Sequence, residues 1–298
     1  MPPAPLPIRD GLNPSRLRMP DSGIWTTVLD YLVARFPADE HRLRDKVASR
    51  EVVDAEGQPI TEFTDFVPRT FVYLYRDPPI EKRVPFDIEI LHRDDNLLVV
   101  DKPHFLASTP RGAYIVESAL VRLRRDLDLP ELTPAHRLDR LTAGVLLFTV
   151  RSAVRRNYQS LFAEREVTKE YEALARFDPA LVLPTTVRSR IVKERGVLKA
   201  YETDGAVNSE SLVELVEVRG KTARYRLRPR TGKTHQLRVH MSSLGIPIHG
   251  DNFYPNFFDV AADDYSTPLR LLARSVEFVD PLSGCLRRFE SRRALEWP

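Results

Sequence analysis

The chain has 298 residues, of which 42% are hydrophobic and 29% are charged, as expected for a globular protein with a sizeable core. With 45 Lys and Arg against 42 Asp and Glu, the formal net charge is only +3, so nucleic-acid binding would need a local basic surface. The single cysteine, Cys285, excludes an intrachain disulfide and a cysteine-based zinc cluster. Residues 1–20 lack the apolar stretch of a signal peptide and no run is long enough to span a membrane, so we expect a cytoplasmic protein.

The first part of the chain predicts two short helices and a few strands. We expect the proline-rich residues 1–23 to be extended or partly disordered. Apolar residues at helical spacing predict a helix over Ile24–Phe36, and Asp39 is a plausible N-cap for a second helix over Asp39–Ala48. A β-rich run, Thr70–Tyr75, follows.

These elements predict a small module over residues 24–80, which Pro78-Pro79 would link to the rest of the chain. The second predicted helix is rich in basic side chains. They are His41, Arg42, Arg44, Lys46 and Arg50. Two interpretations remain open: these side chains grip RNA phosphates, or they form the solvated face of a small packing domain.

Residues 85–298 predict a larger body that mixes strands and helices. The first strands are Phe86–Leu91 and Leu97–Val100, and the first helices are Tyr114–Leu127 and the segment for which Ser152 is the expected N-cap. Arginines cluster around the second of these helices. They are Arg151, Arg155, Arg156 and Arg165, and they form either a solvated or an RNA-facing surface.

The stretch from His136 to Phe148 places a carboxylate directly before a buried strand. Val145–Val150 is apolar and β-rich, which predicts the strand. Asp139 precedes it and is flanked by Arg137 and Arg140, whose charges favour the ionised form. An ionised carboxylate can act as a nucleophile, a general base or an anchor for a substrate hydroxyl. The charge pattern alone favours a structural ion pair at the mouth of the strand.

Further strands follow. Val167–Leu174 alternates, with Lys169 and Tyr171 on one face. Residues 181–210 are basic and show little periodicity, so they are either strands that touch RNA or an exposed excursion. Ser211–Val218 and Thr222–Arg228 predict an antiparallel pair. Three arginines of the second strand share one face, which is either simply exposed or a phosphate track. They are Arg224, Arg226 and Arg228.

The segment from Pro229 to His240 contains two partial motifs. Gly232-Lys233-Thr234 imitates the end of a P-loop, but Leu227 stands where that motif needs a glycine, so we expect no nucleotide cofactor. His235 and His240 lack the spacing of the H-E-x-x-H motif, so we expect no metal. Thr234 is a plausible N-cap for the helix that follows.

Together these segments resemble the RluA-type RNA pseudouridine synthases. His136–Phe148 is similar to the family motif H-R-L-D-x-x-T-S/A-G-L/V-L-L-F, Lys169–Leu174 to K-x-Y-x-A-L, and Thr231–His240 to T-G-R/K-T-H-Q-I/L-R-x-H. Shorter likenesses extend the resemblance over residues 85–298. His104–Ser108 departs from the family, which more often has a glycine-containing loop there.

The resemblance implies an α+β pseudouridine synthase fold, with a mixed, mostly antiparallel sheet and flanking helices. It implies an isomerase that converts uridine to pseudouridine in RNA, without a cofactor or a metal. By resemblance, Asp139 is the catalytic aspartate, Arg238 pairs with it, and Tyr171 stacks on the base or moves a proton. The remaining motif residues would bind substrate or RNA: Arg137 by filling the space of a flipped base, Leu237 by lining the base pocket, and also His136, Arg140, Lys169, Lys233 and His235.

The module over residues 24–80 resembles the α-L type of RNA-binding module, although its start departs from the usual pattern. We expect a monomer. Ribosomal RNA is the first candidate for its substrate, and transfer RNA is the second. Residues 104–112 and 188–199 are where we expect the substrate to be chosen. A non-catalytic RNA-binding protein that retains the synthase fold is the main alternative. A hydrolase using Asp139 is a second one, but the chain has no nucleophile-elbow pattern.

Overall fold

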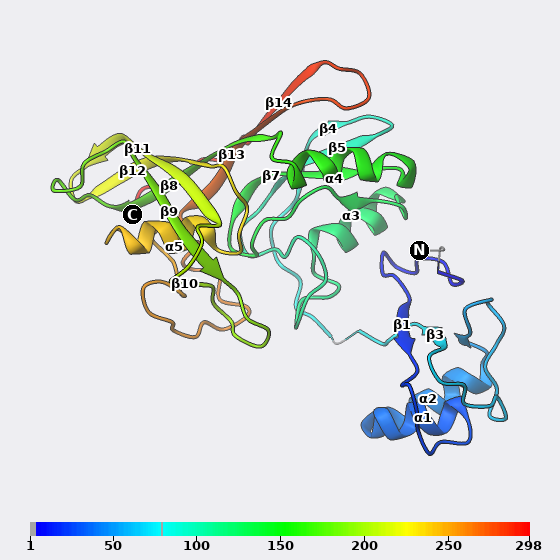
Figure 1. Cartoon of the computed structure of the whole chain (residues 1–298). Helices are drawn as coiled ribbons and strands as arrows, with labels where there is room; N and C mark the ends of the chain where they lie inside the picture. Colours follow the sequence, from blue (N-terminus) through cyan, green and yellow to red (C-terminus); the bar gives the residue numbers. More distant parts are fainter. Residues whose placement is uncertain (1–3, 79) are drawn as a thin grey trace. The chain divides into compact units, whose positions relative to one another are not determined.

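The computed structural model describes residues 4–78 and 80–298 (Figure 1). The chain divides into two compact units, Met1–Ile80 and Glu81–Pro298. Residues 1–3 of the expected extended start and Pro79 of the expected linker lie outside the described residues. No helix in the part of the chain that the structure describes is long and apolar enough to cross a membrane.

The described residues of unit 1 form two α-helices, one short 3₁₀ helix (η1) and a small antiparallel sheet. Its elements are β1 (Ser15–Arg18), α1 (Val28–Arg35), η1 (Pro37–Asp39), α2 (Glu40–Ala48), β2 (Val52–Val53) and β3 (Phe71–Leu74), with strand order β1-β3-β2. The expected extended start thus includes an ordered strand, because β1 pairs with β3. The predicted start of the first helix at Ile24 is wrong. Thr27 caps α1 in a reciprocal box with Asp30, which leaves Ile24 exposed.

Unit 2 is built on one large sheet. Its strands are β4 (Glu89–Arg93), β5 (Leu97–Lys102), β6 (Thr133–Pro134), β7 (Ala143–Thr149), β8 (Thr168–Arg176), β9 (Thr185–Val192), β10 (Tyr201–Thr203), β11 (Ser209–Arg219), β12 (Thr222–Pro229), β13 (Leu271–Val279) and β14 (Leu286–Glu290). Its helices are α3 (Ala119–Leu127), η2 (Ser152–Val154), α4 (Arg155–Ala163) and α5 (Gln236–Ser243). The predicted α+β fold with a mixed, mostly antiparallel sheet is confirmed.

The sheet has the strand order β10-β9-β11-β12-β8-β13-β7-β5-β4, with β14 added to β13 and β6 added to β7. Every pairing is antiparallel except that between β13 and β7. This parallel contact is short, with Leu272 opposite Ala143 and Ala273 opposite Gly144. On its other side, Ala273 lies opposite Tyr171 of β8. Gly144, Ala273 and Tyr171 therefore lie in one row across three neighbouring strands, where the two halves of the sheet meet.

Helices cover both faces of this sheet (Figure 1). Strand β7 alternates between two cores: Leu146 and Phe148 pack with α3, whereas Val145 and Leu147 pack with α4. Helix α5 packs on β8 and β12, in a core that contacts Tyr171. Because Tyr171 also contacts the core of α3, helices α3 and α5 lie on the same face of the sheet. That face carries the candidate site.

Candidate active site

Asp139 lies in a tight turn that leads into β7. The Thr142 N–H donates to the Asp139 carbonyl at 3.1 Å, which closes the turn one residue before the strand begins. The strand itself is buried at every position, because Ala143–Thr149 is the apolar run of the motif. The Asp139 side chain is 28% exposed, so its carboxylate stays accessible on a rigid support.

Three side chains from the end of β5 and the loop after it hold this turn. Ser108 Oγ accepts from the Leu138 N–H at 3.0 Å and donates to the Leu138 carbonyl at 2.7 Å. The fully buried Lys102 donates to the Arg140 carbonyl at 3.3 Å, and His104 Nδ1 donates to the Leu141 carbonyl at 2.7 Å. Burial lowers the pKa of His104 to about 4, so its ring is neutral near pH 7. The backbone on both sides of Asp139 is therefore fixed.

Gly144 permits the strand contact beneath this turn. Its φ is +114°, which L side chains rarely adopt. A Cβ at this position would lie 2.2 Å from the Ala273 carbonyl oxygen. Only glycine allows β7 and β13 to approach closely enough to pair here.

Arg238 reaches the carboxylate from the first turns of α5. Its guanidinium is 2% exposed and binds Asp251 through two bonds, Nε to Oδ2 at 2.8 Å and Nη2 to Oδ1 at 2.6 Å. The remaining Nη1 lies 3.8 Å from Asp139 Oδ2. The partner that fixes Arg238 is thus Asp251, and its contact with Asp139 is the looser of the two. The expectation that Arg238 pairs with Asp139 holds only in this weaker form.

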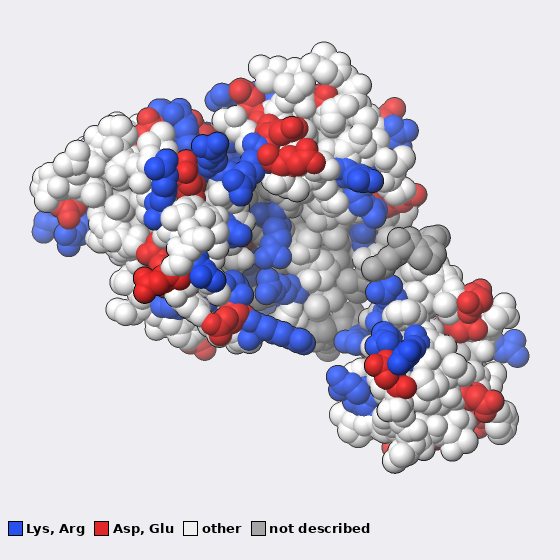
Figure 2. All heavy atoms as spheres, viewed as in Figure 1, with Lys and Arg blue, Asp and Glu red and all other residues white. Residues whose placement is uncertain are grey.

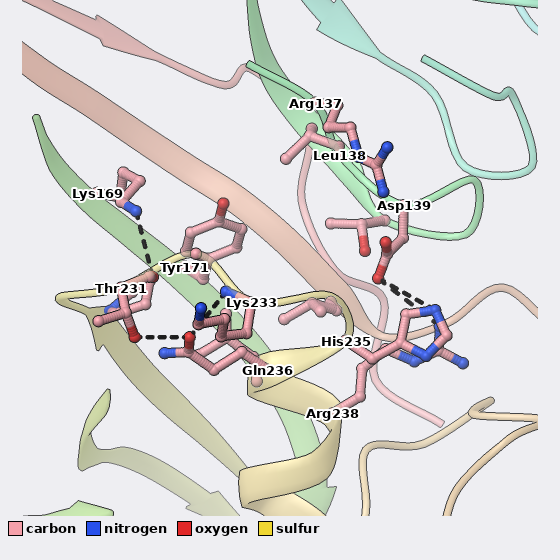
Figure 3. A pocket seen from close by; sticks show the side chains of 15 residues that line it. Arg137, Leu138, Asp139, Lys169, Tyr171, Thr231, Lys233, His235, Gln236 and Arg238 are labelled. Atoms are coloured by element: carbon pink, nitrogen blue, oxygen red, sulfur yellow. Dashed lines mark hydrogen bonds and ion pairs between the residues drawn. The ribbon is translucent and has the colours of Figure 1, made fainter. Parts of the chain in front are cut away.

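His235 approaches the same oxygen from the turn before α5. Its Nε2 lies 3.9 Å from Asp139 Oδ2 (Figure 3). Its Nδ1 lies 3.0 Å from the Tyr254 hydroxyl. Burial lowers the pKa of His235 to about 4, more strongly than the Asp139 charge raises it. The ring is therefore neutral near pH 7.

Helix α5 begins later than predicted. Its N-cap position is His235, in the left-handed region with φ of 57°, so the expectation that Thr234 caps the helix is wrong. Gln236 organises the turn instead. Its side-chain oxygen accepts from Thr231 Oγ1 at 2.7 Å and from the Lys233 N–H at 3.0 Å. This turn carries His235 and Arg238 toward Asp139.

Tyr171 lies on β8, with its ring between Lys169 and Asp139 in Figure 3. Burial, and secondly the charge of Asp139, raises the pKa of Tyr171 above its ordinary value. Its phenol therefore stays protonated near neutral pH.

Two hollows meet at Asp139. The smaller has a volume of about 110 Å³ and is lined by residues from the Asp139 turn, β8 and the turn before α5, among them Tyr171, Leu237 and Lys169. The larger has a volume of about 500 Å³ and is lined by Tyr114, Arg140 and the 252–260 segment, among others. Lys and Arg side chains gather around the hollow in the middle of this face of the unit (Figure 2).

Both the sequence and the fold match known proteins. Residues 96–243 match the family of RNA pseudouridylate synthases. The dual-specificity RNA pseudouridine synthase RluA of Escherichia coli (strain K12) is 38% identical over 172 residues, 55% of this chain and 76% of that protein. The mitochondrial tRNA pseudouridine(32) synthase of Saccharomyces cerevisiae is 31% identical over 185 residues, 60% of this chain but only 39% of the yeast protein. Human RNA pseudouridylate synthase domain containing 4 has a similar fold, with a TM-score of 0.53 and 25% identity over 69% of this chain and 88% of that one.

The chain belongs to the RluA-type RNA pseudouridine synthases. The family predicted from the motifs is thus confirmed, and so is the enzyme class, because these synthases are isomerases. The matched region contains the Asp139 turn, β8 and α5, which build the site described above.

The structure brings most of the predicted site residues of the synthase together. Arg137, Asp139, Lys169, Tyr171, Lys233, His235, Leu237 and Arg238 line the smaller hollow, and Arg140 lines the larger one. Lys169 donates to the Thr231 carbonyl at 3.4 Å, and burial lowers its pKa. The Arg140 guanidinium lies 4.8 Å from the centre of the Tyr114 ring. Arg137 is exposed and makes no ion pair within residues 4–78 and 80–298.

His136 is the exception. Its ring stacks on Phe162 of α4, with centroids 4.3 Å apart, and its Nε2 accepts from the Leu147 N–H at 3.2 Å. Burial lowers its pKa to about 3, so it is a neutral packing residue. Because it belongs to the core on the face of α4, it lines neither hollow. The expectation that His136 contacts RNA is not supported by this placement.

The three arginines of β12 have carboxylate partners. Arg224 contacts Glu172 at 3.3 Å, Arg226 contacts Glu170 at 3.3 Å, and Arg228 contacts both Glu170 and Glu214 at 3.1 Å. Their charges are therefore matched by the neighbouring strands of the synthase, which does not favour the phosphate-track interpretation.

Sequence reasoning missed Asp251 and Gln236 as organisers of the site. The sequence does contain Gly250-Asp251 in a segment that resembles the family, but this pair alone does not show that Asp251 binds Arg238. Within residues 4–78 and 80–298, no three His, Cys, Asp or Glu side chains cluster as a metal site would require.

Proposed function

We propose that this synthase isomerises uridines of structured RNA and that Asp139 is the carboxylate that reacts. The observation that carries the proposal is that Asp139 is the one acidic side chain among the described residues of the smaller hollow. Basic, aromatic, apolar and neutral polar side chains supply the rest of its lining, which suits a nucleotide with an anionic backbone and a flat base.

The reaction breaks the bond between ribose C1′ and uracil N1, turns the base within the hollow, and joins C1′ to C5. The proton on C5 is lost and N1 gains one, so the substrate and the product are isomers and no electron carrier is required. Asp139 either attacks C1′ or removes a proton from C2′ to give a glycal. Both routes require the carboxylate to lie against the sugar, at the mouth of the hollow.

The target base must leave its stack to enter the hollow, which costs a few kcal/mol. Arg137 would fill the vacated space, and its exposed position at the border of both hollows supports this role. Tyr171 would stack on the uracil ring. Its raised pKa keeps the phenol neutral, which favours stacking over removal of a proton by a phenolate.

Of the two candidate substrates, ribosomal RNA is the preferred proposal and transfer RNA is the second. The E. coli relative is named as dual-specific and the yeast relative as a transfer-RNA synthase, so both classes deserve testing. We further propose that the enzyme acts on cytoplasmic RNA as a monomer, and that unit 1 contributes to RNA binding as an α-L-like module.

The test uses full-length protein on unmodified ribosomal and transfer RNA transcripts, with pseudouridines mapped by a chemical adduct that stops reverse transcription. We expect one or a few sites with the native protein. The Asp139→Asn protein should form none while binding RNA within about threefold of native affinity, because the substitution conserves size; loss of a reacting group typically lowers rates by about 10⁴-fold or more. Native protein that binds RNA but modifies nothing would support the non-catalytic alternative.

A further inference from the structure

The hydrogen-bond network behind Asp139 determines which ring nitrogen of His235 carries the proton. Tyr254 Oη lies 2.6 Å from the Ala200 carbonyl oxygen and 3.0 Å from His235 Nδ1. A carbonyl has no hydrogen, so the phenol must donate its only one to Ala200. The bond to His235 therefore requires an Nδ1–H donor. Burial raises the pKa of Tyr254, which keeps the phenol protonated in this role.

The other ring nitrogen of His235 must then be bare. A neutral imidazole carries one proton, and Nδ1 holds it, so Nε2 is an acceptor. This acceptor lies 3.9 Å from Asp139 Oδ2, which is also an acceptor. Two acceptors that face one another so closely repel, unless a donor lies between them. Among the described residues, no side chain bonds to His235 Nε2 or to either Asp139 oxygen at hydrogen-bond distance.

Arg238 adds a donor to the same place. Its Nη1 lies 3.8 Å from the oxygen that faces His235 (Figure 3). Its Nε and Nη2 donate to Asp251. Asp139 Oδ2 thus has an acceptor and a donor beside it, each too distant for a direct bond. A hydroxyl group at this place can donate its one hydrogen to His235 Nε2 and accept through its oxygen from Arg238 Nη1.

We propose that His235 Nε2 accepts a hydrogen bond from the 2′-hydroxyl of the target ribose, and that the synthase recognises RNA rather than DNA through this contact. The inference rests on the proposed function, since Asp139 must lie against C1′ or C2′ for the reaction. The 2′-hydroxyl is on the carbon next to C1′, whereas the uracil N3–H lies on the far side of the base. The 2′-hydroxyl is the group by which a protein distinguishes the two nucleic acids at a given site.

The backbone at His235 allows a matched pair of variants. Asn tolerates the left-handed conformation observed there, with φ of 57°, and its amide can still donate to Tyr254, but it is too short to replace Nε2. Gln can place its carbonyl oxygen near the position of Nε2, but it loses the bond to Tyr254. His235→Asn therefore removes the proposed contact, and His235→Gln retains it.

The experiment measures RNA affinity in an Asp139→Ala background, which leaves the target uridine unreacted and adds no donor beside His235 Nε2. The ligands are two synthetic stem–loops, with the mapped target as uridine or as 2′-deoxyuridine. We expect Asp139→Ala protein to bind the ribose form about five- to tenfold more tightly, the usual effect of one hydrogen bond. Adding His235→Asn should reduce this preference below about twofold, whereas adding His235→Gln should largely keep it.

Several outcomes would overturn the inference. A preference for ribose that His235→Asn leaves intact would assign the 2′-hydroxyl to another group. A preference that is lost in His235→Gln but kept in His235→Asn would mean that only the Tyr254 bond matters. A third ligand carries 3-methyluridine at the target and tests the contact with the base. If His235 determines the loss of affinity for 3-methyluridine but not the loss for 2′-deoxyuridine, then Nε2 contacts N3 of the base. If native protein modifies neither RNA class, the proposed function fails instead.

Discussion

At the scale of single residues, the buried pair of Arg238 and Asp251 supports the site. Asp251→Ala would leave the guanidinium, which is 2% exposed, without its bidentate partner. Removing one member of a buried pair costs about 3–5 kcal/mol. We expect a loss of this size in the free energy of unfolding of unit 2, measured by urea, together with loss of activity. Glu217→Ala is the matched control, because its partner Arg219 is exposed, and it should cost less than about 1 kcal/mol. Equal losses in both variants would contradict the prediction.

The same residues show how far the sequence predicts the site. Asp139, Tyr171 and Arg238 could be identified because each lies in a long motif with a fixed register. Asp251 and the clamp of Lys102, His104 and Ser108 could not. Their effect depends on hydrogen bonds between segments more than 10 residues apart, and a sequence does not show which carbonyl a side chain meets. His136 shares a motif with Asp139 yet faces the other core, because its bond to Leu147 turns it away.

At the scale of elements, the contact between β7 and β13 depends on Gly144. Gly144→Ala would place a Cβ 2.2 Å from the Ala273 carbonyl oxygen, so the strands would have to separate directly beneath the Asp139 turn. We expect a loss of at least about 3 kcal/mol of stability and of nearly all activity. Gly220→Ala is the control: its φ is +59°, but nothing lies within 4 Å of the added carbon. It should cost only about 1–2 kcal/mol and leave the rate of pseudouridine formation unchanged. A fully active Gly144→Ala protein would refute this account of the junction.

The elements that the sequence predicted best are those whose pattern is local. Strand β7 is a continuous apolar run, and β11 and β12 alternate on either side of a glycine turn. Strands β9 and β10 were only one of two alternatives for residues 181–210, and β14 was not predicted. Their exposed, charged faces give weak periodicity. Pairing decides their conformation: β9 pairs with β11, β10 with β9, and β14 with β13. The start of α5 was placed too early, because Gln236 rather than a conventional N-cap fixes it.

At the scale of the whole molecule, buried histidines make stability depend on pH. Burial lowers the pKa of His104, His235 and His240 to about 4 and that of His136 to about 3. The unfolded value is about 6.5, so between about pH 6.5 and 4 the unfolded chain binds more protons than the folded one. Stability is therefore full above about pH 6.5 and falls as the pH decreases.

This pH dependence can be measured by urea unfolding between pH 7.5 and 5, above the range in which most carboxylates titrate. We expect the midpoint for unit 2 to be constant above about pH 6.5 and to decrease below it. His240 is buried and bonds to Ser189 and Ser209 away from Asp139. His240→Gln should lower stability at pH 7.5 but make the decrease toward pH 5 shallower. An unchanged slope would mean that His240 contributes nothing to it.

In unit 1, most basic side chains of the second helix already bond to carboxylates, which limits how much RNA this unit can bind. Arg42 and Lys46 donate to Asp77 at 2.7 and 2.9 Å, and Arg44 donates to Glu40 at 2.8 Å. Arg50 is exposed, and no ion pair to it occurs in the part of the chain that the structure describes. If unit 1 binds RNA, only a few phosphates can be neutralised there without breaking these pairs.

Deleting residues 1–80 tests this arrangement, since Glu81–Pro298 forms its own compact unit. We expect weaker RNA binding and a slope of log affinity against log salt that is smaller by about one to two, because each phosphate contact contributes about 0.7–0.9. In the full chain, Arg50→Ala should reduce this slope by about 0.7–0.9, the contribution of one phosphate contact. Arg44→Ala, whose charge is matched by Glu40, should change the slope little. A slope that the deletion leaves unchanged would show that unit 1 is a packing domain and that the hollowed face of unit 2 supplies the phosphate contacts.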